Sequence, residues 1–378
     1  MRVLLAIHHP LDPNQGASGV TLALGDALEA RGCEVSYFDY RQAFPGVSDH
    51  TAVHNLRFPW VLAHWLSRHA HRFDVLDVTT GDCWPWARMG RPDAKSRHAL
   101  VTRSHGLEHA RSECFREAAR KGSLQLSWKY PLYHGGFRLW EVRQSLLLSD
   151  HSVLINAEDA AYSRERLGVP GTRLSVIPLG LSPEFLASPP PTADSAGPLR
   201  VAFVGTWLPL KGRNELVAVA SALAARDVDF TLSLLGTGGR EAEVLGAFAP
   251  EVRDRIHVTP RYAHERLPEL LSREEVLLFP SHNEGFGMAL VESMASGLVP
   301  VTTPVGVALD VVKEGVSGHL FPVGDVATPV EVLVGLAADR GRLLAMRKAA
   351  QQGVQGMSWT EVAARTLALY EEVLRRKS

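Results

Sequence analysis

Short apolar segments of strand length alternate with helix-forming segments along almost the whole chain. The first example runs from the apolar residues 2–7 through a Gly-rich turn and a helical stretch at 20–32 to a second apolar run at 33–38. Strands that alternate with helices in this way pair in parallel, because each helix carries the chain back across the sheet. The sequence therefore predicts an α/β fold built on parallel sheets.

A Pro-rich stretch divides this alternation into two halves of similar size. Residues 189–191 and Pro198 are prolines among small residues, which is a composition typical of linkers. A chain of 378 residues fits two domains. Because doubly wound sheets bind ligands beyond the carboxyl ends of their strands, we expect the site in a cleft between two such domains. The expected parts are Rossmann-like domains at 1–187 and 199–357, a linker at 188–198 and a C-terminal helix at 358–378.

Charge and composition limit the classes of function. The 40 Lys and Arg residues nearly balance 41 Asp and Glu residues, which argues against a general nucleic-acid binder. Three scattered cysteines indicate neither a disulfide framework nor a CxxC metal site, and no HExxH motif occurs. No apolar stretch approaches the ~18 residues of a spanning helix, and the features of a secretory signal are absent. We expect a cytoplasmic protein without a metal site.

The segment FPSHNEGFGMALVESMASGLVPVTTPVG, residues 279–306, carries the strongest chemical signal. A strand is followed by a loop with Glu284, then by Gly-Phe-Gly and a helix that contains Glu292. Glycines allow close approach of backbone to a ligand, and a helix start offers unpaired N–H groups to a diphosphate. Glu292 lies on an otherwise apolar helix, so its carboxylate needs a partner such as two ribose hydroxyls. By themselves, the two glutamates also fit an ordinary surface acid in the loop, Glu284, and an acid paired on the helix, Glu292.

This segment resembles the E-x7-E region of the family 4 retaining glycosyltransferases, which have the GT-B fold. The similarity continues through Pro300, the TTPVG turn, the EGVSGHLFPVGD stretch and the final helix near Trp359. Upstream, INAEDAAYSRERLGVPGTRLSVIPLGLSPEF resembles the end of the family's N-terminal domain, and residues 40–98 are the least typical. The resemblance implies an acceptor-binding domain, then a donor-binding domain, and a C-terminal helix that packs back on the first.

The resemblance also implies roles for individual residues. Glu284 corresponds to the family's contact with the donor sugar hydroxyls, and Glu292 to its contact with the ribose. His105, after an expected strand, corresponds to a histidine that contacts the transferred sugar; outside the family, a structural histidine is equally consistent with this position. The backbone of Gly285, Phe286, Gly287 and Met288 would meet the sugar and the phosphates.

In each domain, the loop that follows the first strand is a further candidate for diphosphate binding. Gly16 and Ala17 match the family's Gly-rich turn, although such turns also simply connect a strand to a helix. The family pattern G-R-x-x-x-x-K-G places an arginine and a lysine on the diphosphate, and Lys211 matches the lysine. Thr206 stands at the arginine position and supplies neither a fixed charge nor a bidentate fork. Leaving-group stabilisation would then rest on Lys211 with help from Arg213 or another arginine. We expect His105, Glu284 and Lys211 to be the catalytic residues.

The expected function is retaining transfer of a sugar from a nucleotide-sugar donor to a hydroxyl of a saccharide, lipid-linked or small-molecule acceptor, without a cofactor. Two alternatives remain: a non-catalytic sugar-nucleotide-binding partner, for which Thr206 is the chief argument, and a nucleotide-sugar epimerase or hydrolase on the same fold. Residues 88–143 hold 12 Lys and Arg against 5 Asp and Glu, with five Trp, Tyr and Phe at 128–140. That stretch fits an anionic lipid surface, a sugar acceptor or an ordinary solvated helix pair, so peripheral contact with the inner membrane face is a further expectation.

Overall fold

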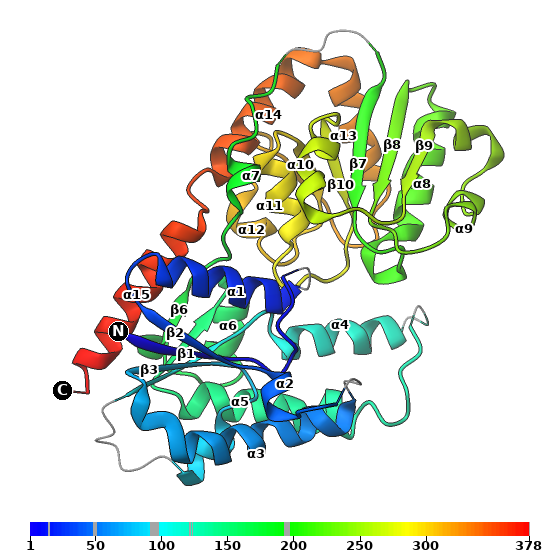
Figure 1. The fold of residues 1–378 in the computed structure, drawn as a ribbon. Helices are drawn as coiled ribbons and strands as arrows, with labels where there is room; N and C mark the ends of the chain where they lie inside the picture. Colours follow the sequence, from blue (N-terminus) through cyan, green and yellow to red (C-terminus); the bar gives the residue numbers. More distant parts are fainter. Residues whose placement is uncertain are drawn as a thin grey trace. The chain divides into compact units, whose positions relative to one another are not determined.

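The computed structural model describes residues 1–13, 16–47, 51–90, 98–120, 122, 124–192 and 197–377. The chain forms two compact units: Met1–Gly180 with Trp359–Ser378 make up unit 1, and Leu181–Ser358 make up unit 2. Each unit contains a six-stranded parallel sheet flanked by helices (Figure 1). The predicted α/β fold with two doubly wound sheets is confirmed.

The sheet of unit 1 has the strand order β2-β1-β3-β4-β5-β6, with every pairing parallel. Successive side chains point to opposite faces of a strand. Val3 and Leu5 accordingly pack with one cluster of apolar side chains, whereas Leu4 and Ala6 pack with another on the opposite face. Because both faces are covered, the strands read as continuous apolar runs. The strands are β1 (Arg2–Ala6), β2 (Glu34–Phe38), β3 (Val75–Thr79), β4 (Ala99–Arg103), β5 (His151–Leu154) and β6 (Leu174–Val176).

Different helices cover the two faces of this sheet. One apolar cluster includes side chains of α1 (Gly16–Glu29) and α15 (Trp359–Arg375), and the other includes side chains of α3 (Ala52–His69). The remaining helices of four or more residues are α2 (Tyr40–Ala43), α4 (Glu108–Arg120), α5 (Arg138–Leu148) and α6 (Ala157–Glu165), with the short turns η2 (Trp86–Gly90) and η3 (Tyr133–Phe137) beside α3 and α5.

The C-terminal helix α15 belongs to unit 1, although it follows unit 2 in the sequence. Its Tyr370 is fully buried and donates a hydrogen bond of 2.5 Å to Oδ2 of Asp77 on β3. Arg103 on β4 donates to the same oxygen from Nε at 3.0 Å and from Nη2 at 2.8 Å. A buried charged network therefore attaches the last helix to the first sheet.

We expect Tyr370→Phe to lower the free energy of unfolding of unit 1 by about 1.5–3 kcal/mol, the range for a hydrogen bond to a charged group. The substitution keeps the ring and removes only the hydroxyl that Asp77 accepts from. Chemical denaturation followed by circular dichroism measures the loss. Tyr162→Phe is the matched control, because its hydroxyl donates to the exposed Glu113 and its loss costs less. Equal losses in both variants would contradict the role of the network.

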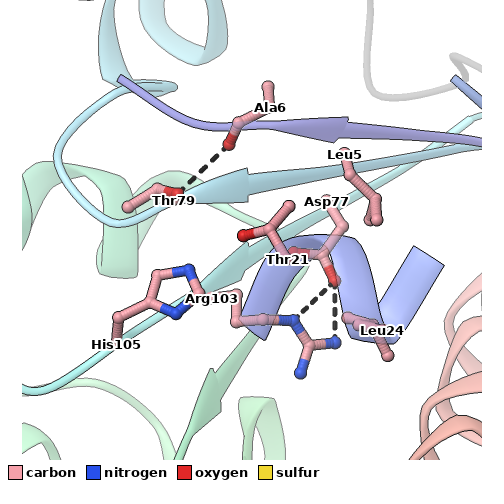
Figure 2. Close-up of a pocket in the computed structure, with 8 residues that line it drawn as sticks. All are labelled: Leu5, Ala6, Thr21, Leu24, Asp77, Thr79, Arg103 and His105. Carbon is pink, nitrogen blue, oxygen red and sulfur yellow. Dashed lines mark hydrogen bonds and ion pairs between the residues drawn. The ribbon is translucent and has the colours of Figure 1, made fainter. Parts of the chain in front are cut away.

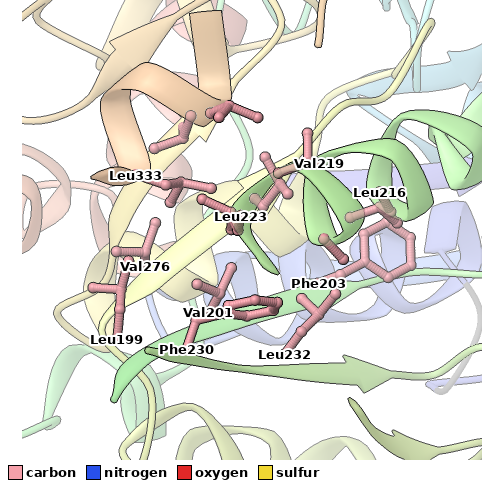
Figure 3. Close-up of a cluster of buried hydrophobic side chains, with 14 of the residues drawn as sticks. Leu199, Val201, Phe203, Leu216, Val219, Leu223, Phe230, Leu232, Val276 and Leu333 are labelled. Carbon is pink, nitrogen blue, oxygen red and sulfur yellow. The ribbon is translucent and has the colours of Figure 1, made fainter. Parts of the chain in front are cut away.

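Unit 2 repeats the architecture with the strand order β12-β11-β10-β7-β8-β9. Val201 and Phe203 from the first strand pack against Leu216 and Val219 of the following helix (Figure 3). The strands are β7 (Leu199–Val204), β8 (Phe230–Leu235), β9 (Ile256–Thr259), β10 (Val276–Phe279), β11 (Val299–Thr302) and β12 (His319–Leu320). The α-helices are α7 (Pro183–Leu186), α8 (Arg213–Ala225), α9 (Glu241–Gly246), α10 (Leu267–Leu271), α11 (Met288–Ala295), α12 (Ala308–Val311), α13 (Ala327–Ala338) and α14 (Arg340–Val354).

The structure differs from the expected element boundaries in two places. The helical segment expected at 328–354 is two helices, because Asp339 interrupts it and caps α14 by accepting a hydrogen bond from the N–H of Arg342. The units divide after Gly180, and not at residue 187. Gln351 of α14 donates to the carbonyl groups of Ser188 and Pro189, so the start of the expected linker packs on unit 2. Residues 193–196 of that linker lie outside the described residues.

Candidate functional site

The loops that follow β7 and β10 of unit 2 meet at one point on the carboxyl edge of the sheet. These strands are neighbours in the sheet, although β8 and β9 lie between them in the sequence. The strand order therefore reverses between β7 and β10. Ligands of doubly wound sheets bind where the order reverses in this way. The β7 loop carries Lys211, and the β10 loop carries Glu284.

Backbone contacts hold these two loops together. Gly212 precedes α8 with φ +78°, and a Cβ at this residue would lie 2.2 Å from the carbonyl oxygen of Pro280. Only glycine combines this left-handed conformation with so close an approach. The N–H of His282 donates to the carbonyl of Leu210 at 2.9 Å. The position of Lys211 relative to the β10 loop is therefore set by the backbone.

Lys211 and Glu284 form an ion pair, with Nζ 2.6 Å from Oε1. The glutamate side chain is largely buried and the lysine is half-buried. Arg213, two residues further on, forms no ion pair within the described part of the chain. Thr206 is exposed at the start of the β7 loop. The two loops thus bring one carboxylate and one ammonium group together, with a guanidinium group close in sequence.

The N-terminus of α11 follows the same β10 loop. Gly287 caps this helix with φ +96°, and Met288 is its first residue. The first N–H groups of a helix have no partner inside it and carry the positive end of the helix dipole. A Cβ at Gly306 would lie 2.4 Å from the carbonyl oxygen of Phe286, which also accepts from the N–H of Val307 at 2.8 Å. The following turn therefore packs against the loop that precedes the helix start.

Glu292 lies in the second turn of α11 and is 5% exposed. Its Oε1 is 2.9 Å from Nε2 of His264, which follows β9. The hydrogen bond with Glu292 raises the pKa of His264, against the smaller effect of burial. Burial raises the pKa of the nearby Tyr262 to about 12, so this residue stays a neutral phenol. The buried carboxylate that the sequence predicted to need a partner has one in His264.

Unit 1 has the corresponding strand-order reversal between β1 and β3. His8 follows β1, and its Nδ1 lies 2.7 Å from Oδ2 of Asp82, which follows β3. The other oxygen of Asp82 accepts from Nη1 of Arg138 at 3.1 Å. Although burial opposes the charged form, His8 and Arg138 lower the pKa of Asp82. This buried carboxylate is therefore ionised and held between the imidazole of His8 and the guanidinium of Arg138.

Two further acids lie beside Arg138. Its guanidinium is 3.6 Å from carboxylate oxygens of both Glu108 and Glu141. Glu141 is fully buried, accepts a hydrogen bond from the indole of Trp84 at 3.2 Å, and has its pKa raised to about 7 by burial. Oε2 of Glu108 is buried and makes no hydrogen bond within the described part of the chain. The carboxyl edge of this sheet thus combines one arginine with three acids.

His105 lines a pocket between the sheet and α1 (Figure 2). It follows β4, and the pocket wall also includes Thr21, Thr79 and the ion-paired Arg103. Nδ1 of His105 is buried without a hydrogen-bond partner in the described residues. Burial and the charge of Arg103 lower the pKa of His105 to about 3, so its imidazole is neutral near pH 7. A neutral imidazole can form hydrogen bonds, but with so low a pKa it is a poor proton acceptor near pH 7.

The expected Gly-rich turn in unit 1 is in fact the first turn of a helix. α1 begins at Gly16, so Gly16 and Ala17 have helical conformation, and Asn14 and Gln15 lie outside the described residues. Gly19 lies on the face toward the preceding loop, since a Cβ there would lie 2.6 Å from the carbonyl oxygen of Pro13. The N–H groups of Gly16 and Ala17 are therefore among the first of α1, which have no partner inside the helix.

The structure brings Lys211 together with Glu284, and places Glu292 on the helix whose N-terminus they adjoin. Sequence reasoning missed His264, His8, Asp82 and Arg138. The first three had only a position shortly after a strand as a signal, and Arg138, at the start of α5, had none. Within the described residues, no group of three or more His, Cys, Asp or Glu is placed to hold a metal ion. No helix in that part of the chain has the length and apolar character needed to cross a bilayer.

Two family models match successive parts of the chain. Residues 14–185 match the model described as Glycosyltransferase Family 4, and residues 189–353 match the model described as Glycosyl transferases group 1. These ranges correspond closely to the first sheet with its helices and to unit 2. The two models therefore describe most of the chain, one sheet each.

Individual proteins show the same relationship. A D-inositol 3-phosphate glycosyltransferase of Nocardia farcinica is 27% identical over 65% of this chain and 62% of its own length. The match spans 38% to 67% of the length of the curated relatives compared. The solved sucrose-phosphate synthase of Thermosynechococcus elongatus superposes with a TM-score of 0.76 at 19% identity, over 99% of both chains. Anabaena HepE, solved in complex with UDP, gives a TM-score of 0.69 at 16% identity, over 98% of this chain and all of HepE.

Proposed function

Because the chain belongs to the family 4 glycosyltransferases with the GT-B fold, we propose that it transfers a sugar from a nucleotide-sugar donor to an acceptor hydroxyl with retention of anomeric configuration. The observation that carries this proposal is the meeting of Lys211 and Glu284 at the strand-order reversal of unit 2. Such a pair offers a cation to a diphosphate and a carboxylate to sugar hydroxyls. The adjoining start of α11 offers N–H groups to the same ligand.

In the proposed complex, the sugar, the diphosphate and the ribose of the donor each have a partner in unit 2. The backbone of Gly285, Phe286, Gly287 and Met288 meets the sugar and the phosphates, and Lys211 with Arg213 faces the diphosphate. Glu284 accepts from the sugar hydroxyls. Glu292 accepts from both ribose hydroxyls, for which a buried carboxylate is suited because it accepts two hydrogen bonds at once. The free helix start at Gly16 and Ala17 is proposed to add N–H groups to the diphosphate.

The chemistry needs charge stabilisation more than a protein base. As the bond between the anomeric carbon and the diphosphate breaks, negative charge grows on the diphosphate, and Lys211 stabilises it. The departing diphosphate oxygen takes the proton of the acceptor hydroxyl, which attacks from the same face. His105 acts as a hydrogen-bonding partner of the transferred sugar, a role that its neutral imidazole supports.

The acceptor is proposed to bind unit 1 at the edge formed by His8, Asp82 and Glu108. Carboxylates and imidazoles bind hydroxyl groups well, so a saccharide, a lipid-linked sugar or a polyol fits this edge. The donor is proposed to carry a uridine diphosphate, as HepE binds UDP in its solved complex. The identity of the base should be tested first, because contacts with the phosphates and the ribose do not distinguish one base from another.

Thermal unfolding of the purified protein with UDP, GDP, ADP and TDP, each near millimolar, tests the proposed donor site. A ligand at about 100 times its Kd stabilises the folded state by roughly 2.7 kcal/mol, which gives a clear rise in Tm. We expect UDP to give the largest rise, and hydrolysis of the matching nucleotide-sugar to follow. A rise without turnover of any donor would favour a non-catalytic binding protein, and the absence of any rise would overturn the donor site.

The pair between Glu292 and His264 predicts a pH-dependent donor affinity. Because the bond to Glu292 raises the pKa of His264, the charged pair is complete below about pH 6.5 and is lost as the pH rises through the raised pKa. Ribose hydroxyls compete with His264 for the same carboxylate. We expect the donor KM to fall about fivefold between about pH 6 and pH 8.5, the equivalent of one ordinary hydrogen bond.

His264→Phe removes the competing group and keeps a ring beside Phe185. In this variant the donor KM should be independent of pH over that range and equal to the high-pH value of the wild type. His319→Phe is the control, since His319 pairs with Glu314, and it should keep the wild-type slope. An unchanged slope in His264→Phe would show that His264 does not compete with the donor.

A further inference from the structure

Four aromatic side chains from three segments form a connected cluster on unit 1. The rings of Trp60 and Trp84 are 5.2 Å apart, and those of Trp84 and Trp140 are 4.8 Å apart. Phe137 stacks on Trp140 with a ring distance of 5.4 Å. Trp60 belongs to α3, Trp140 to α5 and Phe137 to η3, while Trp84 follows β3. The cluster therefore joins the two helices that lie side by side on one face of the sheet.

Three of these rings are only partly covered, although they are among the most apolar side chains of the protein. Trp60 is 47% exposed, Trp140 39% and Phe137 37%, whereas Trp84 is buried beneath them at 6%. Met89 of the adjoining η2 is 62% exposed. Single exposed apolar residues need no explanation, but a contiguous exposed apolar patch is a candidate interaction surface. We call Trp60, Trp84, Met89, Phe137 and Trp140 the aromatic face.

The segments that build the aromatic face contain no Asp or Glu at 51–73 or 84–90, and none at 124–140. Arg57 precedes Trp60 by three residues on α3, so both project from the same side of the helix. Arg88 is exposed next to Met89 and donates to Gln144 of α5 at 3.3 Å. Neither arginine forms an ion pair in the described part of the chain. The aromatic face is therefore flanked by unneutralised positive charge.

We propose that the aromatic face is the surface on which this protein docks to an anionic lipid bilayer. Tryptophan and phenylalanine partition into the headgroup region, and basic residues beside them are attracted by anionic headgroups. The exposed apolar side chains of Met89 in η2 and Leu56 in α3 extend the apolar surface around the rings, which favours a bilayer over a soluble saccharide. Glu141, which follows Trp140 in the sequence, is fully buried and already accepts from Trp84. The docking surface is independent of the proposed sugar transfer.

Co-sedimentation of the full chain with vesicles tests this proposal. Vesicles of phosphatidylcholine alone are compared with vesicles that contain about one third phosphatidylglycerol, at low and at high salt. We expect binding to the anionic vesicles only, and weakening in high salt. Arg57→Glu with Arg88→Glu should reduce binding at least about tenfold. Trp60→Ser with Met89→Ser should reduce it about fivefold or more, because apolar insertion is lost.

Arg164→Glu with Arg375→Glu is the matched control. Both arginines are exposed on helices outside the aromatic face, and the double variant makes the same change in net charge. It should bind anionic vesicles as the wild type does, and circular dichroism establishes that all variants are folded. Donor hydrolysis should be unchanged in the aromatic-face variants, so loss of lipid binding is separable from loss of transfer. The proposal is overturned if the wild type ignores anionic vesicles, if both charge variants lose binding equally, or if the face instead forms a protein dimer.

Discussion

Glu292→Gln is expected to raise the donor KM more than about 100-fold or to abolish sugar transfer. The carboxylate is proposed to accept from two ribose hydroxyls, and each hydrogen bond to a buried charge contributes about 1.5–3 kcal/mol. Glutamine has nearly the same volume but retains one acceptor oxygen and presents an N–H group in place of the other. Steady-state kinetics with varied donor, and isothermal titration with the free nucleotide, measure the loss.

Glu274→Gln is the matched control for this substitution. Glu274 is also a buried glutamate of unit 2, and it precedes β10, whereas the β10 loop follows that strand. Its Oε1 accepts a hydrogen bond of 2.7 Å from the hydroxyl of Ser233. Burial raises the pKa of Glu274 to about 7, so the neutral amide is a mild replacement. This variant should keep the donor KM. If Glu292→Gln remains folded and binds donor as the wild type does, the ribose role of Glu292 is wrong.

The fold was predicted well wherever the residues of a segment are enough to identify its secondary structure. Strands buried on both faces need continuous apolar runs, and runs such as residues 199–204 and 276–279 are recognisable without any tertiary information. The helix α3 is hard to recognise from the sequence, because its 18 residues include several His and Arg residues and Pro59. Its packed side, with Phe58, Leu62 and Leu66, becomes evident only when the sheet that it covers is known.

The same distinction applies to the candidate sites. Glu284 and Glu292 lie in one segment, so their spacing could be read together with the glycines between them. The groups that complete the sites come from far along the chain: His8 is 74 residues from Asp82, and Arg138 is 56 residues from it. His264 is 28 residues from Glu292. Only the strand order brings such groups to one edge, and no local pattern encodes which strands become neighbours.

The ion pair between Lys211 and Glu284 leads to the other large expected effect. Lys211→Ala should lower kcat/KM about 10²-fold, the typical loss when one group that stabilises transition-state charge is removed. Most of the loss should fall on kcat, because charge on the diphosphate grows as the sugar departs. The substitution also leaves Glu284, whose side chain is largely buried, without its cation. That uncompensated carboxylate would repel the diphosphate and add to the loss. Initial rates of transfer or donor hydrolysis measure the effect.

Two further variants separate charge from position at this site. Lys211→Arg keeps the positive charge near Glu284 and should restore activity to within about tenfold of the wild type, since the guanidinium differs from an ammonium in shape. Lys313→Ala removes an exposed lysine elsewhere in unit 2 and should leave kcat/KM unchanged. With Thr206 at the position of a second cation, little else offsets the loss of Lys211. A decrease below about threefold in Lys211→Ala would therefore place the diphosphate away from Lys211, and the stabilising charge would have to come from Arg213 or from the helix start of α11.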